Sequence, residues 1–214
     1  STVWFFRERL KKNGKLDAIW EEFVNQLKAK GYDVKKGVIQ DATFITSDPG
    51  HAKSDVPRGG EAKTRRSRDG EWAKKGNKSF FGYKGHVKVD TENNFIWKVE
   101  TTAANTHDSQ VDLANEGEVR YGDKGYYGAK TNGYDASMKK ATRGHPLSIF
   151  DQLRNKRISR KRSPVERCFS VMKIVFKSGH VMVTTVERAA VKMTFNAIGY
   201  NLFNLLGLVN KNVA

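Results

Sequence analysis

Glu166 stands between two cations at spacings that suit a phosphate-handling site. Arg162 precedes it by four residues and Lys173 follows it by seven, so all three share one face of a helix that begins by Arg162. Pro164 suits the first turn of such a helix, and Ser163 can cap it. We therefore predict a helix from about residue 163. A carboxylate between two cations suits a metal-and-phosphate site, although a solvated charged face is the plainer interpretation.

Two aspartates occupy positions that also suggest chemistry. Asp41 lies within residues 37–45, an apolar and β-branched run that predicts a central strand. A buried carboxylate without a partner is costly, so a metal or another cation is expected near it. Asp123 follows a second short predicted strand, 118–122, and precedes a glycine-containing turn. The end of a parallel strand is where α/β sheets bind ligands.

The composition indicates a polyanionic partner. The 214-residue chain has 39 Lys and Arg against 23 Asp and Glu, a net charge of +16. Such an excess favours nucleic acid first and an anionic membrane surface second. No apolar run approaches the roughly 18 residues that span a bilayer, so we predict no membrane association. The single cysteine, Cys168, excludes an intrachain disulfide and a multi-cysteine zinc site.

The order of the predicted elements indicates an α/β fold. Residues 80–89 and 95–102 read as a hairpin that follows strand 37–45, and residues 133–143 fit a strand with a basic turn. Helices are predicted over residues 1–10, 16–30 and 187–208, and from Thr106. This is the order of a ribonuclease-H-like core, a mixed five-stranded sheet with flanking helices. We assign it to residues 35–214, after a helical segment over residues 1–34.

Residues 47–78 differ from the rest because they hold many glycines and cations and almost no apolar side chains. We predict a long mobile loop. It is either an arm that follows the DNA backbone or a solvated insertion, and the two are about equally supported. Trp72 slightly favours contact with DNA, because an exposed indole can stack on a base.

Other polar residues allow two interpretations each. His107 and Asp108 form either an acid–base pair or, more plainly, a packed histidine beside a helix cap. Lys84 and His86 share one strand face, which either meets DNA or is simply exposed. Lys124 either touches a phosphate or shields Asp123. We assign phosphate contacts to the cations that precede Glu166, namely Arg154, Lys156, Arg157, Arg160 and Lys161.

Taken together, five motifs in this order resemble the DDE transposases of bacterial and archaeal insertion sequences, in the compact group with a short insert between the second Asp and the Glu. Together the motifs cover about residues 37–209. They are Asp41-Ala42-Thr43, Phe81-Gly82-Tyr83-Lys84-Gly85-His86, Thr102-Ala103-Ala104-Asn105-Thr106-His107-Asp108, Gly122-Asp123-Lys124-Gly125-Tyr126 and Val165-Glu166-Arg167. Arg162, Glu166 and Lys173 also match the Arg, Glu and Lys of that family's Tyr-Arg-Glu-Lys signature. Ser159 stands where the family has the tyrosine.

The resemblance implies a function and a site. Asp41, Asp123 and Glu166 would bind two Mg²⁺ or Mn²⁺ ions roughly 4 Å apart that clamp an in-line phosphodiester displacement. One ion would activate water and the other would stabilise the leaving 3′ oxygen, after which the 3′-OH attacks target DNA. The DNA contacts would be Arg162, Lys173, Lys124, Lys84, Arg160, Lys161 and Arg157.

The partners and the setting also follow from the resemblance. They would be double-stranded DNA, at element ends and target, and a second copy of the chain in the DNA complex, in a prokaryotic cytoplasm at the nucleoid. Residues 1–30 resemble only the tail of the family's DNA-binding region, so we expect an N-terminal truncation. Two other functions stay open: a ribonuclease-H-like nuclease that does not join strands, and a DNA-binding remnant without catalysis.

Overall fold

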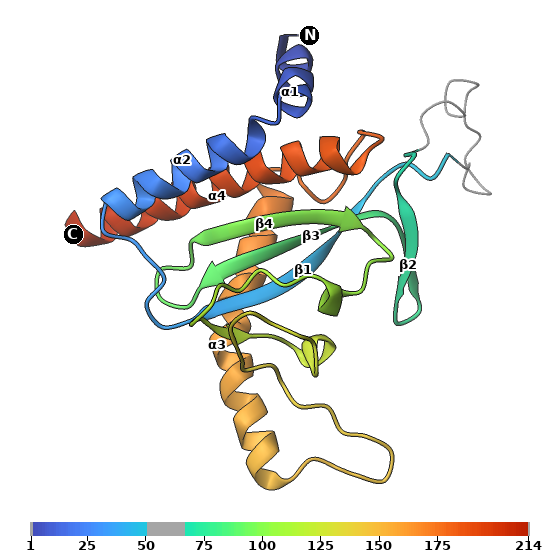
Figure 1. The fold of residues 1–214 in the computed structure, drawn as a ribbon, viewed down its shortest axis with the longest axis vertical. Helices are drawn as coiled ribbons and strands as arrows, with labels where there is room; N and C mark the ends of the chain where they lie inside the picture. The colour runs from blue at the N-terminus through green and yellow to red at the C-terminus, as the bar shows by residue number, and fades with distance from the viewer. Residues whose placement is uncertain (1, 51–66, 214) are drawn as a thin grey trace.

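The computed structural model describes residues 2–50 and 67–213, and it contains one mixed sheet with helices packed on it (Figure 1). The helices are α1 (Thr2–Lys12), α2 (Leu16–Ala29), α3 (Ile149–Ile174) and α4 (Val186–Val213). The strands are β1 (Val38–Thr46), β2 (Glu71–Lys75), β3 (Lys78–Asp90), β4 (Ile96–Ala103), β5 (Val119–Tyr121) and β6 (Tyr134–Asp135). None of the described helices is long and apolar enough to cross a membrane.

The sheet has the pairing of a ribonuclease-H-like core. β3 pairs antiparallel with β1, β2 and β4, and β5 lies parallel to both β1 and β6. The predicted five-stranded α/β core is therefore present as β1, β3, β4, β5 and β6, and β2 adds a strand to it. The division into segments 1–34 and 35–214 stays a prediction.

The strand β2 corrects part of the predicted loop over residues 47–78. Lys75 pairs with Lys78 across the two-residue turn Gly76-Asn77, and Gly76 has φ 59°. A glycine-first two-residue connection is a recognised hairpin signal, so this strand was detectable in the sequence. The charged side chains of β2 are tolerated because they stay exposed. Residues 51–66 of the predicted loop, with most of its cations, lie outside the described residues.

One face of the sheet carries the main apolar core. Ile39 and Ile45 of β1 and Val87 of β3 pack against residues of α3 and α4, namely Val165, Cys168, Met172, Ala189, Met193 and Ala197. α2 and the end of α4 cover β4 in a second cluster around Leu27, Phe95 and Trp97, and Figure 1 shows these two helices side by side. The amphipathic helix predicted at 16–30 is confirmed as α2.

The other face of the sheet is polar and covered by residues 104–118. The sequence predicts a helix from Thr106, but only a 3₁₀ turn forms there, Asp108–Gln110, and extended chain follows. Gln40 explains the difference: its Nε2 donates to the Val111 carbonyl (2.5 Å), and the Leu113 N–H donates to its Oε1 (3.0 Å). A buried side chain from a distant strand thus satisfies backbone groups that a helix would pair internally.

We expect Gln40→Leu to lower the free energy of unfolding by about 2 kcal/mol, because it leaves two buried backbone groups without partners. Urea denaturation measures this change. Gln26→Leu is the matched control, since the Gln26 side chain is exposed and donates to Glu22 one helical turn away. Equal, small effects of both substitutions would contradict the role given to Gln40.

Candidate active site

The register of two neighbouring strands brings Asp41 and Asp123 to the same level. β1 and β5 are parallel, with Val38 opposite Arg120 and Ile39 opposite Tyr121. Asp41 and Asp123 each lie three residues beyond the first of these pairs. Both carboxylates are therefore at the end of β5, where an α/β sheet exposes its ligand-binding edge.

Asp41 is partly buried and bonded at both oxygens. Its Oδ2 accepts a hydrogen bond from Arg162 (2.7 Å), and its Oδ1 accepts one from the Ala42 N–H (2.8 Å). Burial raises the pKa of Asp41; the Arg162 charge opposes this rise, and the charges of Asp123 and Asp108 add to it. The cation predicted near Asp41 is thus present, as Arg162, and neighbouring carboxylates make the region attractive to a further cation.

Asp123 is fixed by the turn that it begins. Its Oδ1 accepts a hydrogen bond from the Gly125 N–H (2.7 Å) and so caps the 3₁₀ turn Lys124–Tyr126. A Cβ at position 125 would lie 2.9 Å from that oxygen, so only glycine fits against the carboxylate without a shift. The Gly-Asp-Lys-Gly motif therefore fixes one carboxylate oxygen of Asp123, and no other described residue bonds the second oxygen.

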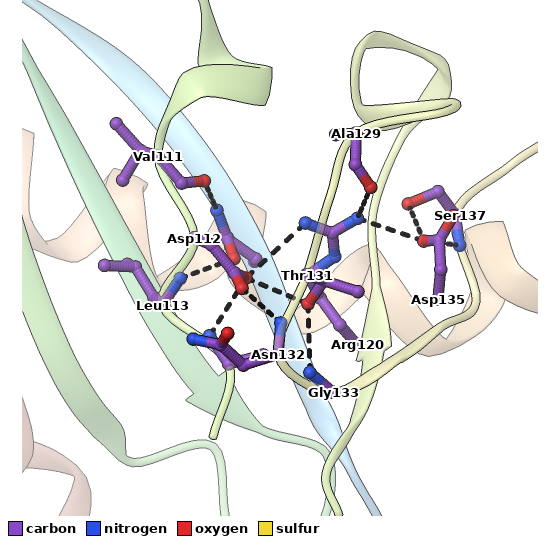
Figure 2. A network of polar contacts seen from close by, with 12 residues as sticks. Val111, Asp112, Leu113, Arg120, Ala129, Thr131, Asn132, Gly133, Asp135 and Ser137 are labelled. Carbon is purple, nitrogen blue, oxygen red and sulfur yellow. Dashed lines mark hydrogen bonds and ion pairs between the residues drawn. The ribbon is translucent and has the colours of Figure 1, made fainter. Parts of the chain in front are cut away.

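A buried arginine, Arg120, connects the segments that flank Asp123 (Figure 2). Arg120, fully buried on β5, lies 3.1 Å from Asp135 and 3.5 Å from both Asp112 and the Ala129 carbonyl. Its guanidinium also lies over the ring of Tyr126, 5.5 Å from the centroid. It thus joins the segments on either side of β5 and the turn that carries Asp123. Sequence reasoning missed Arg120, because no local spacing connects it to partners 8 and 15 residues away.

Next to Asp123 the structure has a small cavity of about 230 Å³, whose lining includes Thr43, Phe44, Lys74, Lys75, Lys84, Asp108 and Asp123. Lys84 is nearly buried, and its ammonium donates to Asp108 (2.8 Å) and to the Thr106 carbonyl (2.7 Å). Burial, and then the charges of Asp41, Asp108 and Asp123, raise the pKa of the buried Tyr126 hydroxyl. Carboxylates and lysines therefore lie side by side around this cavity, with Lys84 neutralising Asp108.

The exposed strand face predicted for Lys84 and His86 is wrong, because residues 104–118 cover it. His86 is fully buried, its Nε2 lies 2.9 Å from the Thr102 hydroxyl, and burial lowers its pKa to about 4. His107, rather than Asp108, caps the 3₁₀ turn, accepting from the Ser109 N–H at 3.2 Å. His107 and Asp108 thus belong to the cavity wall, and DNA contact by Lys84 stays a prediction.

The helix with Glu166 begins earlier than predicted. α3 starts at Ile149 under the cap of Ser148, which accepts from the Asp151 N–H at 3.1 Å, and Pro164 lies inside it. Proline cannot donate to the Arg160 carbonyl, and the Ser163 hydroxyl does so instead at 3.0 Å. The cations of residues 154–162 are therefore on the same helix as Glu166.

Glu166 is exposed and lies one helical turn beyond Arg162. Within residues 2–50 and 67–213, no group of three acidic, histidine or cysteine side chains is close enough to hold a metal ion. Arg162 contacts Asp41, and the charge of Asp123 acts on Asp41. Among the described residues, the side chain of Glu166 contacts neither aspartate. The assignment of all three carboxylates as metal ligands stays a prediction.

The predicted DNA-binding cations fall into two groups. Arg157, Arg160 and Lys124 are exposed, and Lys173 is partly buried, with a pKa lowered by burial and by the charge of Lys75. Lys161 is also exposed but donates to the Tyr121 hydroxyl (2.9 Å), and the half-buried Arg154 donates to the Ser137 carbonyl (2.8 Å). These last two cations fasten α3 to the segments beside it.

The comparison with known proteins identifies the family. The family model described as "Transposase DDE domain" matches residues 33–202. The chain belongs to this family, which confirms the resemblance seen in the motifs.

One curated relative is the transposase for insertion sequence element IS1106 of Neisseria meningitidis serogroup B. It is 26% identical to this chain over an alignment that covers 94% of the chain and 77% of the relative. No solved structure matches the chain.

Proposed function

We propose that this chain is the catalytic part of an insertion-sequence transposase that hydrolyses DNA at element ends and joins the freed strand to target DNA. The family gives the general activity, which is transposition. The observation that supports the catalytic assignment is the shared level of Asp41 and Asp123 on two parallel strands. Glu166 is the third carboxylate, because it lies one turn from the Arg162 that already contacts Asp41.

Asp41 and Asp123 fit a hard divalent cation. Both supply carboxylate oxygens, the ligands that Mg²⁺ prefers, and their charges act on each other in a partly buried place. With Glu166, they would hold Mg²⁺ or Mn²⁺, as two ions in our proposal. Such ions supply a water-derived nucleophile and charge neutralisation at the phosphate.

Two cations of α3 bind the DNA phosphates beside the carboxylates. Arg162 shares its guanidinium between Asp41 and a phosphate, which positions the DNA relative to the carboxylates. Lys173 has no ion pair within the part of the chain that the structure describes, and its lowered pKa reflects the cost of keeping this partly buried charge without a partner. A phosphate removes that cost, so we assign it a phosphate of the bound strand.

DNA binding through these cations should depend strongly on salt. We expect the affinity for an arbitrary duplex to fall by about a thousand-fold between 50 and 200 mM salt if six or more phosphates are contacted. Fluorescence anisotropy with a labelled duplex measures this. Arg157→Gln should reduce the salt slope by about one. Lys98→Gln is the control, because Lys98 is an exposed cation of β4 to which we assign no DNA contact. A flat salt dependence would mean that the net charge of +16 serves another partner.

The assembly and the location are inferred from the family alone. We propose a homodimer in the complex with DNA and a cytoplasmic location at the nucleoid. Light scattering with and without an end-bearing duplex tests the first of these proposals.

The catalytic proposal is tested by incubating the protein with labelled duplex DNA in Mg²⁺, Mn²⁺ or EDTA. We expect nicks with either metal and none in EDTA. Metal-dependent nicking without joined strands would favour a nuclease, and salt-sensitive binding without any nicking would favour a remnant.

A further inference from the structure

A second, larger cavity lies beside the catalytic one. Its volume is about 530 Å³, and its walls include Trp72, Phe80, Phe81, His180 and Met182. The first three come from the β2–β3 hairpin, and the last two from the segment between α3 and α4. The proposed catalytic reaction uses none of these side chains.

The two cavities share one aromatic wall. Phe80 lines the larger cavity and Phe44 lines the catalytic one. Their rings are stacked, with centroids 4.6 Å apart and an interplanar angle of 3°. A flexible DNA strand that is bound at the catalytic carboxylates can therefore extend into the larger cavity.

One wall of the larger cavity is the indole ring of Trp72, which packs against Phe81. Trp72 is 52% exposed although it belongs to a sheet strand. Phe81 packs against it at 5.3 Å and 56°, so one side of the indole is held and the rest stays open. Met182, on the opposite segment, is also exposed.

The opposite wall is held in place by the end of β1. The Thr46 hydroxyl lies 2.9 Å from His180 Nδ1, and the Thr46 carbonyl accepts from the Val181 N–H at 2.9 Å. The cavity is thus formed by two segments with fixed backbones, which suits a flat, rigid occupant.

Cations line the catalytic cavity and also lie next to a wall of the larger one. Lys74 and Lys75 follow Trp72 on β2 and line the catalytic cavity. Lys173 packs along Gly179, with its Cγ 3.6 Å from where a Cβ would be, directly before His180. This arrangement suits a ligand with a flat apolar group for the cavity and a negatively charged backbone for the lysines. An apolar peptide or a lipid tail would leave the lysines without a partner charge.

We infer that this cavity binds an unpaired nucleobase of the DNA strand whose phosphates are held at Lys74, Lys75 and Lys173. The inference rests on the proposed function, because it takes DNA as the substrate. The base stacks on Trp72, and stacking of this kind tolerates any base. A fully paired duplex cannot place a base there without breaking a pair.

The test compares two labelled duplexes in EDTA by anisotropy: one fully paired, and one with a three-nucleotide unpaired flap next to the labelled end. We expect the wild-type protein to bind the flapped duplex at least about five-fold more tightly, the lower end for stacking of one base. Trp72→Ala should abolish this preference, and Trp72→Phe should keep part of it. Phe203→Ala is the control, since Phe203 on α4 is 48% exposed and lines neither cavity.

Three results would overturn the inference: equal binding of both duplexes by the wild-type protein, an unchanged preference in Trp72→Ala, or an equal loss in Phe203→Ala. Nicking in Mg²⁺ is measured on the same proteins. A preference that depends on Trp72 without nicking would support the cavity and contradict the catalytic proposal. Nicking without any preference for the flap would do the reverse.

Discussion

Asp41→Asn, Asp123→Asn and Glu166→Gln should each lower the rate of Mg²⁺-dependent DNA nicking by about a thousand-fold or more. Each substitution removes a carboxylate from the proposed metal site, and loss of several kcal/mol of transition-state stabilisation corresponds to such a factor. Binding of duplex DNA should stay nearly unchanged, because the substitutions remove negative charge and leave the cations of α3 in place. Single-turnover nicking and anisotropy measure the two effects separately.

Asp108→Asn is the matched control for this series. Asp108 lines the same cavity as Asp123, but its carboxylate is bonded to Lys84 at 2.8 Å. We therefore expect a loss of less than about ten-fold, the effect of a group that acts only through its charge. Normal nicking by Glu166→Gln together with a large loss in Asp108→Asn would contradict our assignment and identify Asp108 as the third carboxylate.

Arg120→Met should lower the free energy of unfolding by about 3 kcal/mol, the lower end for breaking a buried ion pair by removing one partner. The substitution leaves Asp112 and Asp135 without their shared cation and removes the guanidinium from above Tyr126. Burial alone would raise the pKa of Asp135, but hydrogen bonds from Ser137 and the charge of Arg120 hold it below its usual value. Urea denaturation at neutral pH measures the loss.

Arg157→Met is the control for Arg120→Met, because Arg157 is exposed on α3 and should cost less than about 0.5 kcal/mol. If both substitutions had the same small effect, the network in Figure 2 would not hold the Asp123 turn in place.

Local patterns predicted much of the scaffold. The spacing of Leu16, Ile19 and Trp20 predicted α2, and the apolar run at 37–45 predicted β1 with Asp41 on it. Asp90 also closes the predicted hairpin, since its carboxylate accepts from the N–H groups of Glu92 and Phe95 at 2.9 and 2.7 Å. In each case the signal and the structure that it produces lie within a few residues of each other.

The differences arise where distant residues decide the local structure. Gln40 draws residues 111–113 into an extended path where Thr106 suggested a helix start. Pro164 is a local exception, because the adjacent Ser163 bonds the Arg160 carbonyl and so allows a typical first-turn residue in mid-helix. The burial of Lys84 and His86 depends on a segment about 20 residues further along the chain. Arg120 joins Asp112 and the Ala129 carbonyl, on two loops, to Asp135 on β6, and no local spacing predicts that arrangement.

The candidate site shows the same contrast. The motifs named Asp41 and Asp123, and the β1–β5 register places them together. The helix face of Arg162 and Glu166 was also predicted, and Arg162 reaches Asp41. How far Glu166 lies from the aspartates depends on the packing of α3 on the sheet, which spacing cannot supply.

The most direct test of the central claim is strand transfer. A labelled duplex that carries an element end and exposes a 3′-OH is incubated with the protein, Mn²⁺ and a supercoiled target plasmid, and label in the plasmid is measured. We predict label joined to the plasmid with wild-type protein and none with Glu166→Gln or in EDTA. Joining by Glu166→Gln at the wild-type rate, or metal-dependent nicking by the wild-type protein without any joined product, would contradict the assignment of this chain as a transposase that uses Asp41, Asp123 and Glu166.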